Sequence, residues 1–374
     1  MAAHARLSAS GSHRWIACPA SVEAERTVPD KGSPHAFEGT TAHELGEICL
    51  KEKCDAEAWI GKVLPETHAE VTQEMADYVQ DYLDYVRYHD HCDAYLGIEV
   101  RVDFSDWVPE GFGTCDAIIL HGDLLHVIDL KYGKGVAVSP VENSQGLLYA
   151  LGAYSEFRAL AEIKRVRISI VQPRVTDSPE HWEISLDDLL KWGEYAKQRA
   201  EIACQPDAEF NPGEKQCQFC KAKPTCPALK AHVEQTLMAD FDSLTHLTPV
   251  NRLEPEQISR VLNHKKLIVS WLDAVETYVK ERLEDGEAFP GFKLVAGRSN
   301  RAWATDPSVE AKLADIFGDQ AYSRKLISPA QAEKILGRKR VEEIADLVVK
   351  PKGEPTLAGA DDPRPAVNIS VDDF

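Results

Sequence analysis

The sequence predicts an α/β protein in which a mixed central sheet is flanked by helices. Two observations lead to this prediction. Apolar residues recur at helical spacing in segments that come before and after three successive segments of strand character. Glycine-containing turns at Gly111, Gly113 and Gly122 separate those three segments, as in a β-meander. The resulting order is helices, three strands, helix, strand and helix.

The N-terminal part of the chain is expected to be helical. Residues 1–30 are typical of a loop followed by a short helix, and the next helix should begin where Thr40 or Thr41 can cap it. Residues 68–92 form a longer helical pattern, because their apolar residues recur three or four positions apart: Val71, Met75, Tyr78, Val79, Tyr82, Leu83 and Val86.

Strand and helix patterns then alternate. The three strands of the meander are expected at residues 95–104, 113–123 and 124–134. A helix is expected at 141–160, a strand at 166–174 and a further helix from Leu186 to Cys204. These segments complete the predicted α/β core with its mixed sheet.

A second region follows the core, and we place the boundary near residue 235. Its first element should be one long amphipathic helix over residues 254–284. A strand near residues 292–297 and two shorter helices, at 307–317 and 329–348, come next. The chain is thus predicted to have a domain over residues 1–234, an α+β accessory region over 235–350 and an extended acidic tail over 351–374.

Composition restricts the class of protein. The 374-residue chain has 44% hydrophobic and 28% charged residues, which is usual for soluble globular proteins. It has no apolar run of about 18 residues and its first residues lack a secretory pattern, so we expect a cytoplasmic protein without a membrane partner. The nine cysteines, an odd number, argue against a disulfide framework. The net charge of −19 excludes coating of nucleic acid by bulk attraction, but it is compatible with a DNA enzyme.

One strand places an acid and a base together. Asp129 and Lys131 stand two residues apart, so their side chains leave the same face, about 7 Å apart. A hairpin joined at Gly122 would bring Asp116 beside Asp129. Two carboxylates on adjacent strands suit Mg²⁺ or Mn²⁺, and a lysine could orient or deprotonate a water for phosphodiester hydrolysis. The alternative is an ion pair with no catalytic role.

Three further side chains are candidates for the same site. His43 is not part of the zinc-protease HExxH motif, because Glu47 occupies the second histidine position. His43 would be a metal ligand if its helix packs over the carboxylates, and a structural residue otherwise. Gln145 and Tyr149, four residues apart on one helix, share a face that could contact a nucleic-acid backbone or pack in the core.

The cysteines predict a separate metal site. Cys217, Cys220 and Cys226 follow a C-x2-C-x5-C pattern, which brings three thiolates to one centre. Cys18 is the expected fourth ligand, since it also precedes a proline in a loop-like, aromatic setting. Such a four-cysteine site can hold either structural Zn²⁺ or an iron–sulfur cluster.

Taken in order, these motifs resemble the RecB-like branch of the PD-(D/E)xK nucleases. The resemblance covers residues 10–230 and is greatest to members with an iron–sulfur cluster: the nuclease domain of AddB-type helicase–nucleases, CRISPR-associated RecB-like exonucleases, and a phage and prophage family of unknown function. It rests on Cys18, His43, G-x-x-D at 113–116, D-x-K at 129–131, Q-x-x-x-Y at 145–149 and the three later cysteines.

The resemblance implies a restriction-endonuclease-like core and a metal-dependent DNA nuclease. It points to an exonuclease that acts on single- or double-stranded DNA ends in phage or prophage recombination, replication or repair, inside a bacterial cell. A phage single-strand-binding or recombination protein is a candidate partner. The second acid of the motif is Asp129 here, where many relatives have glutamate, and both residue types bind metal.

The resemblance also assigns roles to individual residues. It implies that the metal ligands are His43, Asp116, Asp129 and the main-chain carbonyl of Leu130. Lys131 would then position the attacking water. Gln145 and Tyr149 would hold the DNA strand. The four cysteines would carry a [4Fe–4S] cluster that joins the N-terminus to the end of the nuclease domain.

Glu99 and a C-terminal basic segment are the remaining candidates. Glu99 could support the site from its strand or face solvent. Lys293, Arg298, Arg301 and Trp303 could form a strand-binding surface or a solvated hairpin. The alternative functions are a non-catalytic DNA-binding or scaffold protein and a zinc-stabilised interaction module. Retention of the complete set of motif residues favours the nuclease, because an inactive protein need not keep them.

Overall fold

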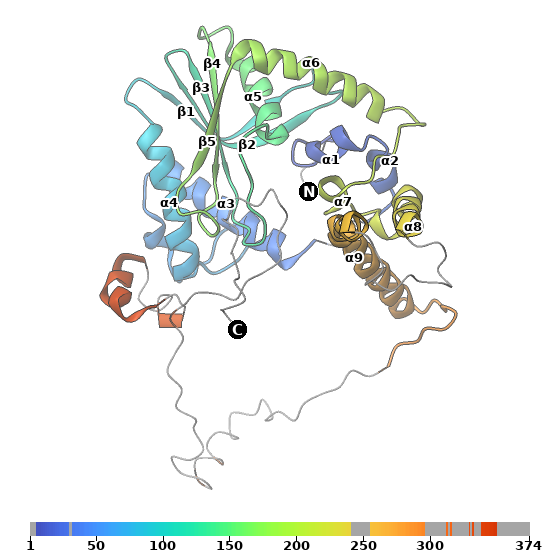
Figure 1. Cartoon of the computed structure of the whole chain (residues 1–374). Coiled ribbons are helices and arrows are strands. Elements are labelled where there is room, and N and C mark those ends of the chain that lie inside the picture. Colours follow the sequence, from blue (N-terminus) through green and yellow to red (C-terminus); the bar gives the residue numbers. More distant parts are fainter. Residues whose placement is uncertain are drawn as a thin grey trace, which may run out of the picture. The chain divides into compact units, whose positions relative to one another are not determined.

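The computed structural model describes residues 5–29, 32–240, 255–295 and 338–349, with a few single positions between 312 and 332. Its elements are shown in Figure 1. In chain order they are α1 (Ser12–Ala17), α2 (Ser21–Glu25), α3 (Pro34–Glu52), η1 (Ala56–Trp59), α4 (Gln73–His89), β1 (Tyr95–Asp103), β2 (Phe112–His121), β3 (Leu124–Leu130), α5 (Ser144–Phe157), β4 (Arg165–Val171), β5 (Glu180–Ser185), α6 (Leu186–Ala203), α7 (Glu214–Cys217), η2 (Lys223–Thr225), α8 (Pro227–Asp240), α9 (Pro255–Glu284) and η5 (Arg338–Leu347).

A five-stranded mixed sheet with the order β1-β2-β3-β4-β5 forms the centre of the protein. The first three strands are antiparallel, and a two-residue turn joins β2 to β3 through Gly122, whose φ of 58° suits glycine. β4 is parallel to β3, and β5 pairs antiparallel with β4. The expected meander and mixed sheet are confirmed. β5 was not predicted, because this short, largely exposed edge strand lacks a clear apolar pattern.

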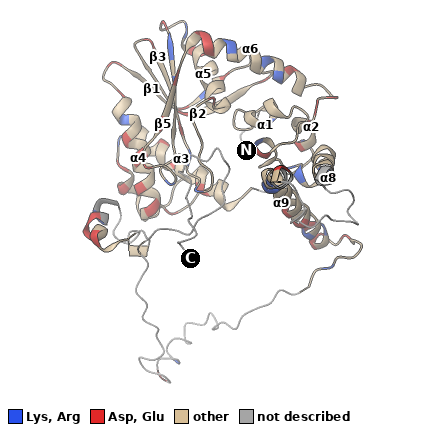
Figure 2. Ribbon diagram, in the orientation of Figure 1, with Lys and Arg blue, Asp and Glu red and all other residues tan. Residues whose placement is uncertain are grey.

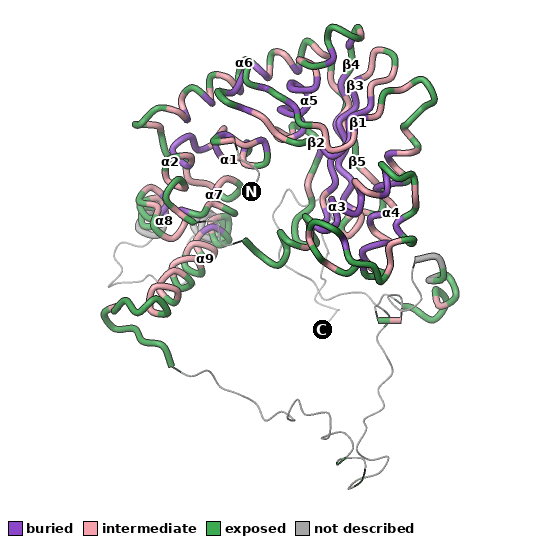
Figure 3. Tube along the Cα trace, turned by 180° about the vertical axis from the view of Figure 1, so that it is seen from behind, coloured by how far each residue is buried: buried purple, intermediate pink, exposed green. Residues whose placement is uncertain are grey.

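Helices cover both faces of the sheet (Figure 1). α5 and α6 enclose one apolar cluster against the strands, with members such as Val102, Leu125, Leu147, Leu151 and Ile168. α3 and α4 enclose a second cluster on the opposite face, with members such as Leu45, Leu83, Ala117, Ile128 and Val171. Figure 3 shows that buried residues follow the strands and α5. The sheet is therefore a buried middle layer between two helical layers.

α3 begins earlier than the sequence pattern suggested. Ser33 is its N-cap, with a side chain that accepts a hydrogen bond from the first turn (3.0 Å), and Pro34 follows at the first helical position. The expected start at Thr40 or Thr41 was wrong, since both hydroxyls donate to backbone carbonyls inside the helix. His43 consequently lies in the middle of a long helix and not in its first turn.

The contacts divide the chain into two units, residues 1–275 and 276–374. This division lies within α9, farther along the chain than the expected boundary near residue 235, which stays a prediction. α9 confirms the expected long helix. In the expected 292–297 strand, Phe292 forms only an isolated bridge with Phe289. The helix expected at 307–317 lies largely outside the described residues, and the 351–374 tail lies wholly outside them. Within the helix expected at 329–348, Arg338–Leu347 is a 3-10 helix.

Charge and hydropathy along the described elements bear on the expected partners. Acidic residues occur along several elements, including α4 and α6 (Figure 2). No helix within the described ranges combines the length and apolar character needed to cross a membrane.

Candidate functional site

Two adjacent strands bring the predicted carboxylates together. The β2–β3 ladder ends where Ala117 pairs with Ile128, and Asp116 and Asp129 are the next residues of the two strands. Asp116 Oδ2 accepts a hydrogen bond of 2.6 Å from the backbone N–H of Leu130. Asp116 is 8% exposed and Asp129 is 3% exposed. Two carboxylates in so dry a place need positive charge nearby, because the removal of ions from water is costly.

α3 brings His43 to the same place. Its Nδ1 lies 3.2 Å from Asp116 Oδ1. Burial alone would lower the pKa of His43, but the Asp116 carboxylate and other nearby acids outweigh it and raise the pKa to about 9. The helix therefore packs over the carboxylates, which is the arrangement in which His43 can serve as a metal ligand.

Glu99 completes a group of three potential ligands. One ligand atom from each of His43, Glu99 and Asp116 lies within 4.8 Å of the others, and no other such group occurs in the part of the chain that the structure describes. Burial and the Asp116 carboxylate raise the pKa of Glu99 to about 7. Glu99, whose role the sequence left open, thus belongs to the site.

The backbone explains why strand alternation did not place Glu99. Its φ of 50° is in the left-handed region, which is unusual for a residue other than glycine. Ile98 pairs with Ala117 and Val100 with Cys115, but Glu99 itself is missing from the ladder. Ile98 packs against the α3–α4 cluster and Val100 against the α5–α6 cluster, so the strand changes faces at Glu99. Strained backbone of this kind tends to occur at functional sites.

Lys131 and Gln145 form a second network beside this group. Lys131 Nζ lies 2.8 Å from Asp129 Oδ2 and donates to Gln145 Oε1 at 2.9 Å. Gln145 Nε2 donates to Asp129 Oδ1 (3.1 Å) and to the Tyr149 hydroxyl (3.2 Å). The partner of the buried Asp129 Oδ2 is thus the Lys131 ammonium, and a carboxylate oxygen with one partner has a lone pair left for a cation.

The charge states of this pair follow from their surroundings. Burial raises the pKa of Asp129, although the Lys131 ammonium opposes the shift. Burial lowers the pKa of Lys131, but the Asp129 carboxylate outweighs it and the net pKa is raised. Lys131 is therefore an ammonium that can orient a water or balance negative charge, and it is poorly suited to act as a base.

Tyr149 connects the site to the core. The ring is 7% exposed and lies against Gly113, where an added Cβ would come within 2.6 Å of Tyr149 Cε1. The glycine of the G-x-x-D pattern is needed because only a residue without a side chain leaves room for this ring. The interpretation of Tyr149 as a core residue is therefore confirmed, and its contact with a nucleic-acid backbone stays a prediction.

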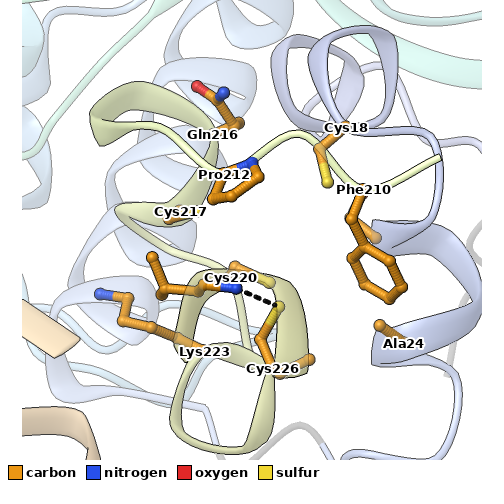
Figure 4. A pocket seen from close by; sticks show the side chains of 12 residues that line it. Cys18, Ala24, Phe210, Pro212, Gln216, Cys217, Cys220, Lys223 and Cys226 are labelled. Carbon is orange, nitrogen blue, oxygen red and sulfur yellow. Dashed lines mark hydrogen bonds between the residues drawn. The ribbon is translucent and has the colours of Figure 1, made fainter. Parts of the chain in front are cut away.

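The four predicted cysteines line one pocket (Figure 4). Cys18 follows α1, Cys217 ends α7, and the other two lie in the loop after it. Backbone N–H groups donate to three of the sulfurs: Asn211 to Cys18 (3.3 Å), Gly213 to Cys217 (3.4 Å) and Leu229 to Cys226 (3.4 Å). Donors of this kind stabilise negative charge on thiolates.

The spacing and pKa of these thiols bear on what they could hold. No three of the four sulfurs, all in described residues, lie within 4.8 Å of one another. A single tetrahedral Zn²⁺ with bonds of about 2.3 Å requires sulfurs less than about 4 Å apart. Burial raises the pKa of Cys220 to about 12 and also raises the pKa values of Cys18 and Cys217, so a bound cation would be needed to keep them as thiolates.

Polar contacts also join the two halves of this pocket. Arg14 forms an ion pair with Glu25 (3.0 Å) and donates to the carbonyl of Phe219 (3.2 Å). Glu25 accepts a hydrogen bond from the backbone of Lys221 (2.7 Å). The N-terminal segment is therefore held against the segment of the later cysteines by charged contacts.

The remaining candidates are the C-terminal basic segment and Leu130. Arg298, Arg301 and Trp303 fall outside the described residues, and Lys293 is exposed. Leu130 is fully buried and donates its N–H to Asp116, while the role expected for its carbonyl is untested by these contacts.

Comparisons with known proteins give a family match and a distantly similar solved structure. A family model described as "Protein of unknown function (DUF2800)" matches residues 4–365. Among solved structures, that of the protein SSO0001 is 14% identical, and the match covers 59% of this chain and 85% of that chain with a TM-score of 0.29. A TM-score this low carries no argument, so a function has to be inferred from the residues of the site.

Proposed function

This chain belongs to the DUF2800 family, and we propose that it is a metal-dependent DNA nuclease with a RecB-like, PD-(D/E)xK core. The observation that carries the proposal is the grouping of His43, Glu99 and Asp116 beside Asp129 and Lys131 at one end of the sheet. An imidazole, three carboxylates and a buried ammonium are the components of metal-assisted phosphodiester hydrolysis.

A divalent cation fits these donors. His43, Glu99, Asp116 and Asp129 would hold it, and the main-chain carbonyl of Leu130 is a further candidate ligand. Oxygen-rich sites suit Mg²⁺ and Mn²⁺, and the single imidazole nitrogen favours Mn²⁺. The bound ion would polarise the phosphoryl oxygen and lower the pKa of a bound water. The Asp129 carboxylate supports this fit, since its buried Oδ2 is paired with the Lys131 ammonium and has a further lone pair that a cation can use.

The other residues of the site would position the water and the strand. The Lys131 ammonium would orient the attacking water and offset charge on the phosphoryl group. Gln145 holds the Lys131 and Asp129 side chains in register by hydrogen bonds to both. Tyr149, bonded to Gln145, would direct its hydroxyl toward the DNA backbone.

We further propose that the four cysteines hold a [4Fe–4S] cluster. A cluster is favoured over a single Zn²⁺ ion because no three of these sulfurs lie within 4.8 Å of one another, and the three backbone donors suit cluster thiolates. The role of the cluster would be to join residues 12–25 to residues 209–226. A cytoplasmic exonuclease on DNA ends, in phage or prophage recombination, replication or repair, is the activity we propose for the whole.

Cleavage of end-labelled DNA tests the proposed function. Single- and double-stranded substrates should be degraded with Mg²⁺ or Mn²⁺, and EDTA should stop the reaction. Lys131→Ala should reduce the rate by about 100-fold or more, with DNA affinity retained, whereas Lys164→Ala at an exposed position serves as the matched control. Glu99→Gln should raise the metal concentration needed for half-maximal rate. Cleavage by Lys131→Ala at the wild-type rate would refute the assignment and favour a non-catalytic DNA-binding protein.

A further inference from the structure

The segment between β3 and α5 lies directly beside the proposed site. Residues 133–138 follow Lys131 and lead to the helix that carries Gln145. Most of these residues are exposed, and Val136, an apolar side chain, is 46% exposed. We define residues 133–138 as the glycine loop.

One buried side chain, that of Gln172, binds the backbone of the glycine loop. Gln172, 3% exposed, donates from Nε2 to the carbonyls of Gly133 (3.2 Å) and Val136 (2.8 Å). Its Oε1 accepts from the N–H of Val138 (3.0 Å). Because β3 and β4 are parallel and Leu130 pairs with Val171, the segments after both strands run side by side. The glycine loop is therefore an ordered surface and not a loose connection.

Neither backbone conformation nor a contact inside the protein explains why positions 133 and 135 of this loop are glycines. Neither Gly133 nor Gly135 has a φ in the left-handed region, and a Cβ at either position would have no heavy atom within 4 Å. Gly113 differs, since Tyr149 crowds it. Glycine loses more conformational freedom on folding than any other residue, so its use at an open position calls for an external reason. One such reason is the close approach of a ligand to the backbone.

We propose that the glycine loop is the docking surface for the single DNA strand that leads to the scissile phosphate. The strand passes over Gly133 and Gly135, Lys134 contacts a phosphate, and Val136 packs on a base. Lys134 pairs with Glu74 (3.0 Å) at the surface, and a phosphate can replace this partner. A single strand exposes its base faces along its length, whereas a duplex stacks them inside, so a contact with the exposed Val136 favours a single strand. The inference rests on the proposed nuclease function.

Binding of a fluorescein-labelled oligothymidylate, followed by anisotropy with EDTA present, tests the surface without catalysis. Gly133→Ala and Gly135→Ala should weaken binding at least about fivefold, because a methyl group overfills the contact. Their thermal unfolding should stay at or above the wild-type temperature, since nothing inside the protein meets the new methyl. Val136→Ser should also weaken binding, whereas Leu160→Ser, in the exposed turn at the far end of α5, should not.

A second substrate separates this inference from the proposed function. Thymidine 5′-monophosphate p-nitrophenyl ester has no flanking strand, so the ratio of kcat/KM for the oligonucleotide over that for the ester should fall at least about fivefold in the loop variants. If Gly133→Ala, Gly135→Ala and Val136→Ser all bind the oligonucleotide with wild-type affinity, the proposed docking surface is wrong, while the proposed nuclease function is unaffected. Weakened binding by these variants, in a wild type that cleaves neither substrate, would uphold the surface and overturn the nuclease.

Discussion

Replacement of Gly113 by alanine tests the packing that holds Tyr149 in the site. The new Cβ would lie 2.6 Å from Tyr149 Cε1, so either the ring or β2 must shift. Overpacking in a well-filled core costs about 1–3 kcal/mol. We expect Gly113→Ala to lower the free energy of unfolding by about this amount, measured by urea denaturation with an unchanged m value. The shift should also disturb Gln145, because its Nε2 bonds to the Tyr149 hydroxyl.

A double-mutant cycle shows whether the ring is the cause. Tyr149→Ala alone should cost about 3–5 kcal/mol, as other buried aromatic truncations do. Without the ring, the three atoms nearest to the new Cβ are absent, so the two effects should differ from additivity by about 1–3 kcal/mol. Gly39→Ala is the control, because this open position in α3 should gain about 0.5–1 kcal/mol. Additive effects, or full stability of Gly113→Ala, would refute the packing argument.

Two further predictions concern the thiol pocket and the buried histidine on the sheet. Cys18→Ser should lower iron content and thermal stability together, whereas Cys204→Ser, outside the pocket, should change neither; equal iron in both variants would exclude Cys18 as a ligand. Burial, followed by the charges of His89 and Arg167, lowers the pKa of His126 well below its ordinary value. In the unfolded chain the His126 imidazole takes up a proton near pH 6.5, whereas in the folded chain it stays neutral at this pH. The contribution of His126 to the free energy of unfolding is therefore complete above about pH 6.5 and is lost as the pH falls below this value. His126→Asn should flatten the fall in unfolding free energy between about pH 6.5 and 5, and an identical slope would contradict this cause.

The parts of the site that the sequence predicts correctly depend on short-range geometry. Asp129 and Lys131 share a face because alternation along one strand is local, and their 2.8 Å contact follows from it. Asp116 lies beside the Asp129 end of β3 because a two-residue turn leaves the hairpin little freedom of register. The same local logic places Gln145 and Tyr149 on one helical face.

The parts that were missed depend on backbone conformation or on competition between similar signals. Glu99 reaches the site only because its left-handed φ takes it out of the ladder, and residue type does not reveal that conformation. Ser33 followed by Pro34 is as good a helix start as Thr40 or Thr41. The start at the threonines was predicted because the apolar helical pattern begins next to them. The weak edge strand β5 takes its structure from β4 and carries little pattern of its own.

The order in which the chain is synthesised has a consequence for the thiol pocket. Cys18 leaves the ribosome first, and at about 5–20 residues per second the chain up to Cys217 takes about ten seconds or more to complete. Every strand of the sheet, and α3 to α6, is encoded between these two cysteines. The sheet and its covering helices can therefore form while the pocket still lacks three of its four thiols. The pocket is therefore completed after the core, and a chain that stops before Cys226 cannot complete it. A pocket with all four thiols can form only in a chain whose core has been fully translated.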